Sequence, residues 1–182
     1  IDPTITWASY YNNTSSSDFH ANSVFDSQGN IYTAFATYTA AWPVINAGGS
    51  QYFDAVKDGS LDLVIARINA NYSKQWATYY GGNGSDVLCG TGGDYGKTIV
   101  VDGNDDVYVG GKTSGSNVFP TQTSGVGGAF YQDQTKLYGG DTPSLLKFNA
   151  AGVRQWATMF QHEQANTSSP GMRINGICAK GA

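Results

Sequence analysis

A five-residue stretch occurs three times in this chain and limits the folds that the chain can adopt. It reads Trp-Ala-Ser-Tyr-Tyr at 7–11, Trp-Ala-Thr-Tyr-Tyr at 76–80 and Trp-Ala-Thr-Met-Phe at 156–160, so the intervals are 69 and 80 residues. Self-similarity at such a period is typical of repeat architectures, in which each copy buries its apolar face against the next copy. The sequence therefore predicts one repeat region over residues 1–182, with the repeated Trp residues packed between units.

The repeat divides the chain into two complete units and the start of a third. We expect the first unit over 12–80, the second over 81–160 and the beginning of the third over 161–182. Only 13% of the residues are charged, whereas the chain has 24 Gly and 12 Tyr. This composition favours a β-rich protein with a neutral, polar surface.

Each unit reads as two β-hairpins whose connectors carry the turn-forming residues that hairpins need. Residues Leu63–Ala66 are apolar on both strand faces, which predicts a strand sandwiched between neighbouring sheets, because a sheet with one wet face would alternate. The predicted hairpins join 22–26 to 31–35, 62–69 to 74–80, 98–102 to 107–111, and 144–149 to 153–160.

Four short antiparallel strands per unit, stacked face to face on like units, describe a β-propeller blade, so the expected fold class is all-β. Two complete blades flanked by parts of two others give ten expected strands, including a leading strand at 7–11 and a trailing strand at 173–179. A closed propeller has at least four blades. We therefore expect either a piece of a longer protein or a subunit that closes by assembly.

Charge and hydropathy argue against two classes of partner. The net charge is −4 and no cluster of Lys and Arg occurs, so nucleic acid is not an expected partner. No apolar run approaches the roughly 18 residues of a membrane span, so membrane insertion is not expected. The chain opens at Ile1 directly on a strand, as a mature or excised segment would, and spacing leaves open whether Cys89 and Cys178 pair.

Two long connections, 38–61 and 112–143, carry most of the aromatic residues outside the strands. Loops of this length are often functional, and rigid rings give contact area at a low entropic cost. The alternative is that rings in matching positions pin each loop to its own unit: Trp42 with Phe119, Tyr52 with Phe130, and Phe53 with Tyr131. The candidate ligand-binding residues are Trp42, Tyr52, Phe53, Phe119, Phe130, Tyr131 and Tyr138.

One stretch indicates a metal. Asp102, Asn104 and Asp106 place oxygen ligands at alternate positions, as in the opening of a calcium loop. The stretch lacks the Gly at the sixth position and the distal Glu of such a loop, and the matching segment 26–30 suits a plain hairpin turn. Calcium is thus the one cofactor that the sequence raises, and turn formation is the favoured interpretation.

Catalysis has less support. His20 and His162 lie outside the hairpins and away from any candidate nucleophile. Carboxylates near the long loops could form an acid/base pair, as in sugar hydrolysis, but the sequence does not fix their separation. We therefore expect no catalytic residues. The carboxylates considered are Asp54, Asp58, Asp62, Asp133 and Asp141.

The landmarks of the second unit follow a fixed order that resembles a known family. They are Trp-Ala-Thr-Tyr-Tyr-Gly-Gly at 76–82, Asp86, Ile-Val-Val-Asp-Gly-Asn at 99–104, Val-Tyr-Val-Gly-Gly-Lys-Thr at 107–113, Phe119-Pro120, Gly-Ala-Phe at 128–130, Leu-Leu-Lys-Phe-Asn at 145–149 and Gly152. This order resembles the bacterial SBBP repeat, the "seven-bladed β-propeller" repeat of secreted and surface proteins. The first copy departs from it with Asn12-Asn13 in place of Gly-Gly, and the third copy with Gln161-His162.

The resemblance implies a propeller fold and an extracellular or cell-surface location, and it brings no catalytic residue with it. The expected function is a non-enzymatic scaffold or adhesion module that binds glycan or a surface protein through its loops. One alternative is a self-assembling, lectin-like subunit of which several copies complete a propeller. Another is a fragment of an extracellular glycan-active enzyme, which requires two close carboxylates in one pocket with a raised pKa on one of them.

Overall fold

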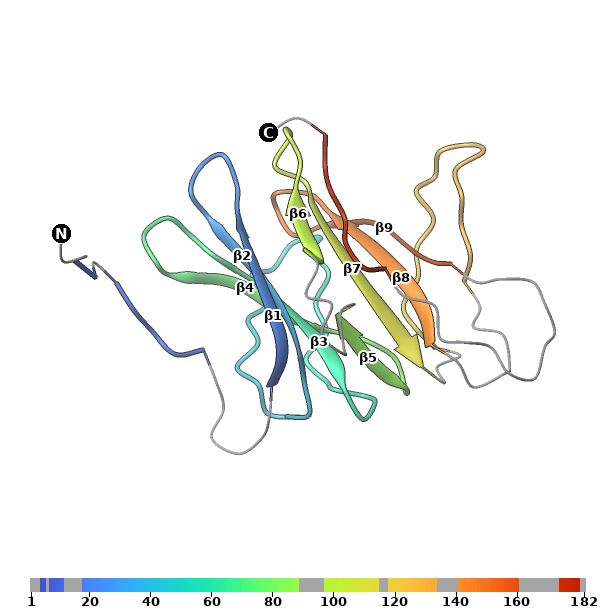
Figure 1. The fold of residues 1–182 in the computed structure, drawn as a ribbon, viewed down its shortest axis with the longest axis horizontal. Coiled ribbons are helices and arrows are strands. Elements are labelled where there is room, and N and C mark those ends of the chain that lie inside the picture. The colour runs from blue at the N-terminus through green and yellow to red at the C-terminus, as the bar shows by residue number, and fades with distance from the viewer. Residues whose placement is uncertain are drawn as a thin grey trace.

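The computed structural model describes residues 4–5, 7–11, 18–88, 97–114, 118–133, 141–160 and 174–180. Its regular secondary structure is entirely β, which confirms the all-β prediction (Figure 1). None of the described residues belongs to a helix long and apolar enough to span a membrane. The strands are β1 (Asp18–Phe25), β2 (Ile31–Thr37), β3 (Asp62–Ile68), β4 (Lys74–Tyr80), β5 (Ser85–Leu88), β6 (Ile99–Val101), β7 (Val107–Ser114), β8 (Asp141–Phe148) and β9 (Arg154–Met159).

The first sheet contains β1 to β4 as antiparallel neighbours in chain order. Its two hairpins, β1–β2 and β3–β4, match the predicted segments, and β2 pairs with β3 along its whole length. The edge strand β1 is continuous, with a register shift between Phe19 and Asn22. The first repeat unit therefore folds as its hydrophobic pattern and turn residues predict.

The second sheet repeats this order but has a divided edge. Its path is β5-β7-β8-β9, and β6 also pairs with β7. The strand β5 pairs with one end of β7, and β6 pairs with the other end. Two short strands thus take the edge position that β1 alone has in the first sheet. The second unit therefore has five strands among its described residues in place of the expected four, because β5 and β6 both pair with β7.

The two predicted end strands are absent from the described residues. Residues 7–11 and 174–180 contain no strand, which corrects the expected count of ten. A β-ladder needs successive backbone bonds between two segments. Ile177 donates its amide to the Lys97 carbonyl at 2.9 Å, and this single bond does not make a ladder.

One turn design closes all four hairpins, and local sequence explains it. An Asp or Asn at the first position accepts the amides of the third and fifth residues, while the fourth residue has a positive φ. Those fourth residues are Gly29, Tyr72, Asp105 and Gly152, with φ of 79°, 64°, 61° and 80°. The two accepted bonds measure 3.0 and 2.8 Å at Asp26, 3.0 and 2.9 Å at Asn69, 2.9 and 3.0 Å at Asp102, and 3.0 and 3.0 Å at Asn149.

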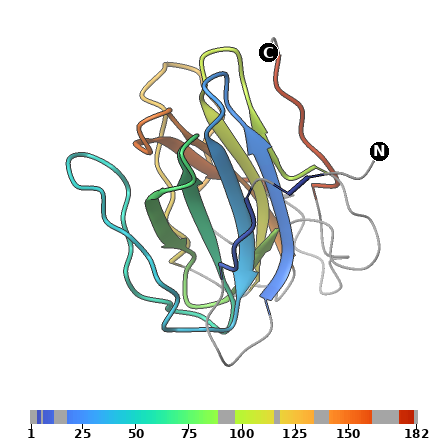
Figure 2. The ribbon, with the colours of Figure 1, turned by 90° about the vertical axis from the view of Figure 1, so that its left-hand side faces the viewer.

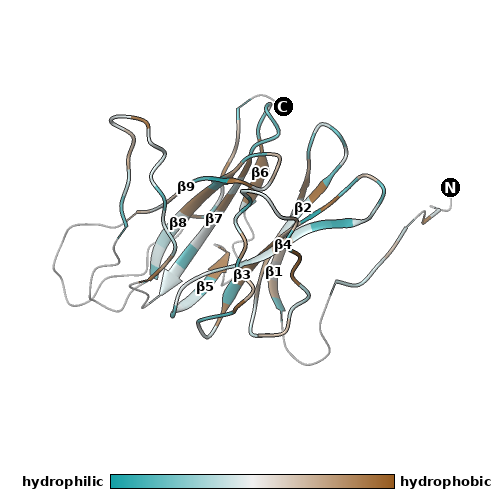
Figure 3. Ribbon diagram, turned by 180° about the vertical axis from the view of Figure 1, so that it is seen from behind, coloured by the Kyte–Doolittle hydropathy of each residue, from teal (hydrophilic) through white to brown (hydrophobic). Residues whose placement is uncertain are grey.

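The core lies between the two sheets, which pack face to face. Figure 2 shows β1, β2 and β4 in front of the strands of the second sheet. Figure 3 shows hydrophobic residues along the strands of both sheets and hydrophilic ones at several turns. Leu63–Ala66 are fully buried on both faces, as predicted for a sandwiched strand. The main core residues are Tyr32, Leu63, Ile65, Trp76 and Tyr80 from the first sheet, and Val107, Val109, Leu146, Phe148 and Met159 from the second.

Candidate functional site

The outer face of the first sheet carries an open apolar groove. The groove has a volume of about 660 Å³ and runs over β1 and β2 beside residues 7–11. Phe25 lines it with 69% of its surface exposed, and its ladder partner Ile31 also lines it. The corresponding pair in the second sheet, Val101 and Val107, packs into the core between the sheets. The same face of the repeat is therefore open on the first sheet and buried against the other sheet on the second.

The outer face of the second sheet carries another groove, with a volume of about 400 Å³. Leu145 and Trp156 line it from the strands, and Phe130, Tyr131 and Phe160 line it from the loop and the end of β9. The same repeat positions of the first sheet are buried against the second sheet. These buried counterparts are Ile65, Trp76 and Tyr80.

Two of the candidate loop aromatics are buried, at matching positions. Trp42 packs edge-on against Tyr11, with ring centroids 5.2 Å apart, and Phe119 packs edge-on against Tyr80 at 5.5 Å. Both Trp42 and Phe119 therefore touch the tyrosine that ends the repeated five-residue stretch. This geometry is that of rings pinning a loop to the sheet, although Trp42 also lines the groove of the first sheet. A ligand-binding role for Trp42 and Phe119 stays a prediction.

The other candidates lie at the loop bases. Tyr52 packs on Tyr80 with ring centroids 4.8 Å apart and the rings tilted by 40°, and Phe130 stacks on Phe160 at 5.1 Å with an interplanar angle of 2°. The Tyr131 hydroxyl lies 3.1 Å from the Thr121 hydroxyl, and Phe53 is half-buried. Tyr138 lies outside the described residues. A ligand-binding role for Tyr52, Phe53, Phe130 and Tyr131 stays a prediction.

Two cations that were not among the predicted site residues complete these aromatic contacts. The Lys74 ammonium lies 4.6 Å above the Tyr11 ring and donates to the Pro43 carbonyl at 2.8 Å. Arg154 repeats the arrangement, since its guanidinium donates to the Tyr80 hydroxyl and to the matching proline carbonyl, each at 3.1 Å. Burial raises the pKa of Tyr80 although the arginine lowers it. The signal was present, because both cations lie two residues before a repeated Trp.

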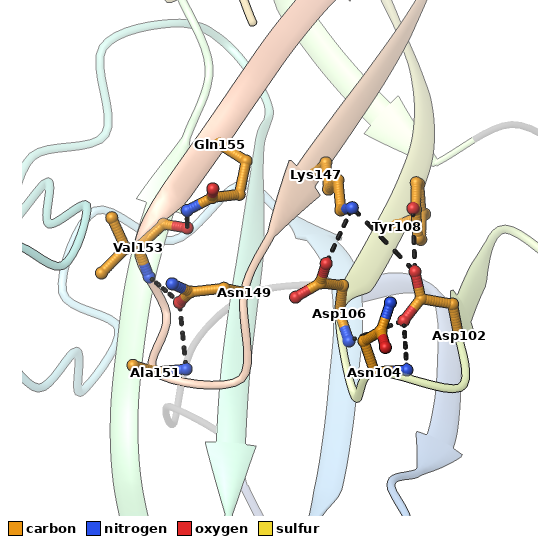
Figure 4. A network of polar contacts seen from close by, with 9 residues as sticks. All are labelled: Asp102, Asn104, Asp106, Tyr108, Lys147, Asn149, Ala151, Val153 and Gln155. Atoms are coloured by element: carbon orange, nitrogen blue, oxygen red, sulfur yellow. Dashed lines mark hydrogen bonds and ion pairs between the residues drawn. The ribbon is translucent and has the colours of Figure 1, made fainter.

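The candidate calcium residues form a hairpin turn (Figure 4). Asp102 accepts the amides of Asn104 and Asp106 and, at 3.0 Å, the hydroxyl of Tyr108. The Lys147 ammonium lies 2.7 Å from the Asp106 carboxylate and 4.0 Å from that of Asp102. Partial burial lowers the pKa of Lys147, but its bonds to Asp106 and Tyr108 outweigh this and raise it. Turn amides and a lysine thus satisfy these oxygens, and calcium at this turn stays a prediction.

One of the carboxylates considered for catalysis meets a second carboxylate. Asp62 is 1% exposed and lies beside Asp86, which is 0% exposed and which the sequence analysis did not single out as a site residue. Burial raises the pKa of Asp62, and it raises that of Asp86 to about 7. Neither residue lines the two grooves described above. The pair therefore has the raised pKa that an enzyme would need, and it lies outside these two grooves.

The remaining carboxylates serve local structure or lie apart. Asp54 accepts the Val56 amide at 2.9 Å, and Asp141 forms an ion pair with Lys112. Asp58 and Asp133 are exposed. Among the residues that the structure describes, no group of three or more His, Cys, Asp and Glu side chains could hold a metal ion.

Comparison with known proteins leaves the family open. No protein-family model matches the chain, and no curated protein matches it. The SBBP assignment therefore stays a prediction that rests on the sequence landmarks.

Proposed function

We propose that the chain is a section of a β-propeller that serves as a non-enzymatic extracellular scaffold, with its two open faces covered by further copies of the same repeat. The observation that carries this proposal is the match between open and buried faces. The open face of each sheet bears the repeat positions that the other sheet buries in the shared core. The packing between the two sheets therefore indicates how a further copy of the repeat would pack on each outer face.

Residues 7–11 support this interpretation on the first sheet. Tyr11 donates its hydroxyl to the Pro43 carbonyl at 3.3 Å and packs on Trp42. Where the first sheet meets the second unit, Tyr80 of β4 bonds in the same way to the Pro120 carbonyl and packs on Phe119, the ring equivalent to Trp42. Residues 7–11 therefore occupy the place on the first sheet that 76–80 occupy on the second, beside a groove that a further sheet would fill.

The polar residues support a structural role rather than a catalytic one. The first residue of each hairpin turn uses its side-chain oxygen to accept hydrogen bonds from turn amides. These residues are Asp26, Asn69, Asp102 and Asn149. Asp105 clamps the two sheets together, because its carboxylate accepts the amide and the hydroxyl of Ser27 at 2.8 and 2.7 Å. These contacts fix the hairpins and the distance between sheets, as a rigid scaffold requires.

The loop tips are the surfaces that such a scaffold would present to a glycan or protein. An added Cβ at Gly48, Gly49, Gly125 or Gly128 would meet no heavy atom within 4 Å, so the tips stand clear of the sheets. The aromatic rings lie at the loop bases instead. Contact through the small, polar tips belongs to this proposal, and the extracellular location rests on the SBBP resemblance alone.

Two variants that each break one outer face test the proposal. Phe25→Asp places a charge in the groove of the first sheet, and Phe160→Asp places one in the groove of the second. We expect the unmodified chain to self-associate in sedimentation velocity as its concentration rises, and each variant to sediment as a monomer. An equimolar mixture of the two variants is expected to form one-to-one dimers, because each keeps the face that the other lost.

Circular dichroism of each variant checks that its fold is intact, and Val56→Asp, an exposed substitution outside both grooves, is the matched control. A mixture that remains monomeric would overturn the proposal. So would self-association of the unmodified chain that neither variant weakens, since the contact would then lie elsewhere.

A further inference from the structure

A cluster of oxygen atoms is buried where the first sheet meets β5. Asp62 begins β3, and Asp86 lies in β5 opposite Thr113 of β7. A Cβ added to Gly81 would lie 2.8 Å from Asp86 Oδ2 and 3.1 Å from Asp62 Oδ1, so both carboxylates approach one point. Only glycine at 81 leaves room for this approach. Asp62, Asp86 and Thr113 are all within 1% of complete burial.

The hydrogen bonds in this cluster are incomplete. Asp62 accepts the amides of Asp58 and Gly59 at 3.1 and 3.2 Å, and Asp86 Oδ2 accepts the Gly82 amide at 2.8 Å. Asp86 Oδ1 and Thr113 Oγ1 have no hydrogen-bond partner. The Thr113 hydroxyl is close enough to lower the pKa of the Asp86 carboxyl, but the two groups lack the geometry of a hydrogen bond. A fully buried acceptor of this kind destabilises the fold when it is left unsatisfied.

The charges are also uncompensated. Lys57 is the basic residue near Asp62, but its ammonium donates to the carbonyls of Gly59 and Ser60 and makes no ion pair with the carboxylate. Two carboxylates buried near the same point need a positive charge beside them or a proton on one of them. The cluster therefore lacks a positive charge, and its oxygen donors suit a cation that prefers oxygen ligands.

We propose that Asp62, Asp86 and Thr113 bind a calcium ion between the two sheets. Two carboxylates and a hydroxyl form an all-oxygen donor set, which suits a hard cation, and calcium accepts irregular, flexible coordination more readily than magnesium does. The ion would fasten β3 of the first sheet to β5 and β7 of the second. This site lies inside the chain and does not depend on the proposed covering of the outer faces.

The first sheet supplies a matched position without the site. Asp18 pairs with Thr37 in the ladder as Asp86 pairs with Thr113. There the threonine hydroxyl accepts the Thr39 amide at 2.9 Å, and Asp18 is exposed. The repeated Asp–Thr pair thus becomes a candidate cation site only in the second sheet, where the first sheet packs against it and adds Asp62.

Calorimetric titration of the chelator-treated full chain with calcium chloride tests the proposal. We expect one bound ion per chain and a higher melting temperature with calcium than with chelator. Asp86→Asn and Thr113→Val are expected to weaken binding at least tenfold, and both preserve side-chain shape so that the fold survives. Asp18→Asn is the matched control and is expected to bind like the unmodified chain.

Two results would overturn the proposal. Loss of calcium binding in Asp102→Asn, with binding intact in Asp86→Asn, would place the ion at the hairpin turn instead. Absence of any calcium-dependent heat or melting shift, together with an infrared band of a protonated carboxyl that Asp86→Asn removes, would show that a shared proton supplies the positive charge.

Discussion

The two sheets build the same edge in different ways. In the first, β1 runs without a break from Asp18 to Phe25, whereas in the second β5 (Ser85–Leu88) and β6 (Ile99–Val101) share the edge. The ladder pairs at the two ends are nevertheless equivalent, since Asp18 pairs with Thr37 as its counterpart does in the second sheet. Pairing to the neighbouring strand, and not continuity of the chain, therefore defines the repeat.

The sheets also differ in what covers them, and this changes the environment of identical residues. Trp76 is 2% exposed and donates its indole N–H to the Tyr52 carbonyl at 3.0 Å, whereas Trp7 is 40% exposed and stacks on Tyr72 at 4.7 Å. The same residue in the same repeated stretch is core in one copy and surface in the other. A neighbouring sheet, rather than the local sequence, makes the difference.

Truncating the two Trp residues is the largest test of this comparison. Trp76→Ala should lower the free energy of unfolding by about 3–5 kcal/mol, because it empties a packed position between Phe148 and Gly152. Trp7→Ala should cost less than about 1 kcal/mol, because it removes one exposed stack. Urea denaturation followed by circular dichroism measures both values. Equal costs would mean that Trp7 is covered in solution, and the comparison would fail.

The next largest expected effect is a change in the pH dependence of stability, which should occur at Asp86 and not at the matched Asp18. It is measured in calcium-free buffer. Burial raises the folded-state pKa of Asp86 from 3.8 to about 7, so the folded chain holds a proton that the unfolded chain has released between those values. The preference of the folded chain for protonated Asp86 costs no stability below about pH 4, where the unfolded chain is protonated too. As the pH rises from about 4 to about 7, the free energy of unfolding falls by about 2–4 kcal/mol. Asp86→Asn should remove this loss, whereas Asp18→Asn should keep it.

Denaturation midpoints from pH 4 to pH 8 measure this difference. The comparison uses the difference between each variant and the unmodified chain, because other carboxylates titrate in the same range. A slope that survives in Asp86→Asn would assign the effect to another group.

The hairpins could be predicted from sequence because their causes are local. Alternating and apolar runs define the strands, and an Asp or Asn placed five residues before the start of a strand accepts the amides of its own turn. Asp26 and Asn149 both act in this way. The matched loop rings could also be paired by position, since Trp42 and Phe119 make equivalent contacts.

The other features of the fold and of the candidate site depend on contacts between segments far apart in the sequence, and no local sequence pattern predicts such contacts. The division of the second edge depends on where the chain returns to β7, and the expected strand at 7–11 would have needed a ladder partner. The Asp62–Asp86 cluster depends on two sheets meeting at Gly81. Burial changes the chemistry of Asp86, and burial is set by tertiary packing rather than by neighbours in sequence.

The turn acids test whether the two sheets use their shared design with equal effect. Asp26→Ala removes two turn amides and a bond from the Asn30 side chain, and Asp102→Ala removes two amides and the Tyr108 hydroxyl. Each change should cost about 1–2 kcal/mol of unfolding free energy. Urea denaturation of the Ala variants, with Asn variants as controls that keep one acceptor oxygen, measures the costs. A difference above about 1 kcal/mol would show that the sheets do not depend equally on this turn.

The smallest effect concerns the left-handed turn position that Tyr72 and Gly152 share, with φ of 64° and 80°. Tyr72→Gly relieves about 0.5–1 kcal/mol of backbone strain and loses the exposed stack on Trp7, so the net change should stay within about 0.5 kcal/mol. Gly152→Ala adds strain and a Cβ 3.3 Å from the Trp76 ring, and should cost about 1 kcal/mol. The Gly is thus required where the neighbouring Trp is buried, and a Tyr is tolerated where it is exposed. Thermal melts of the two variants measure this difference, and a large loss in Tyr72→Gly would show that Trp7 depends on its stack.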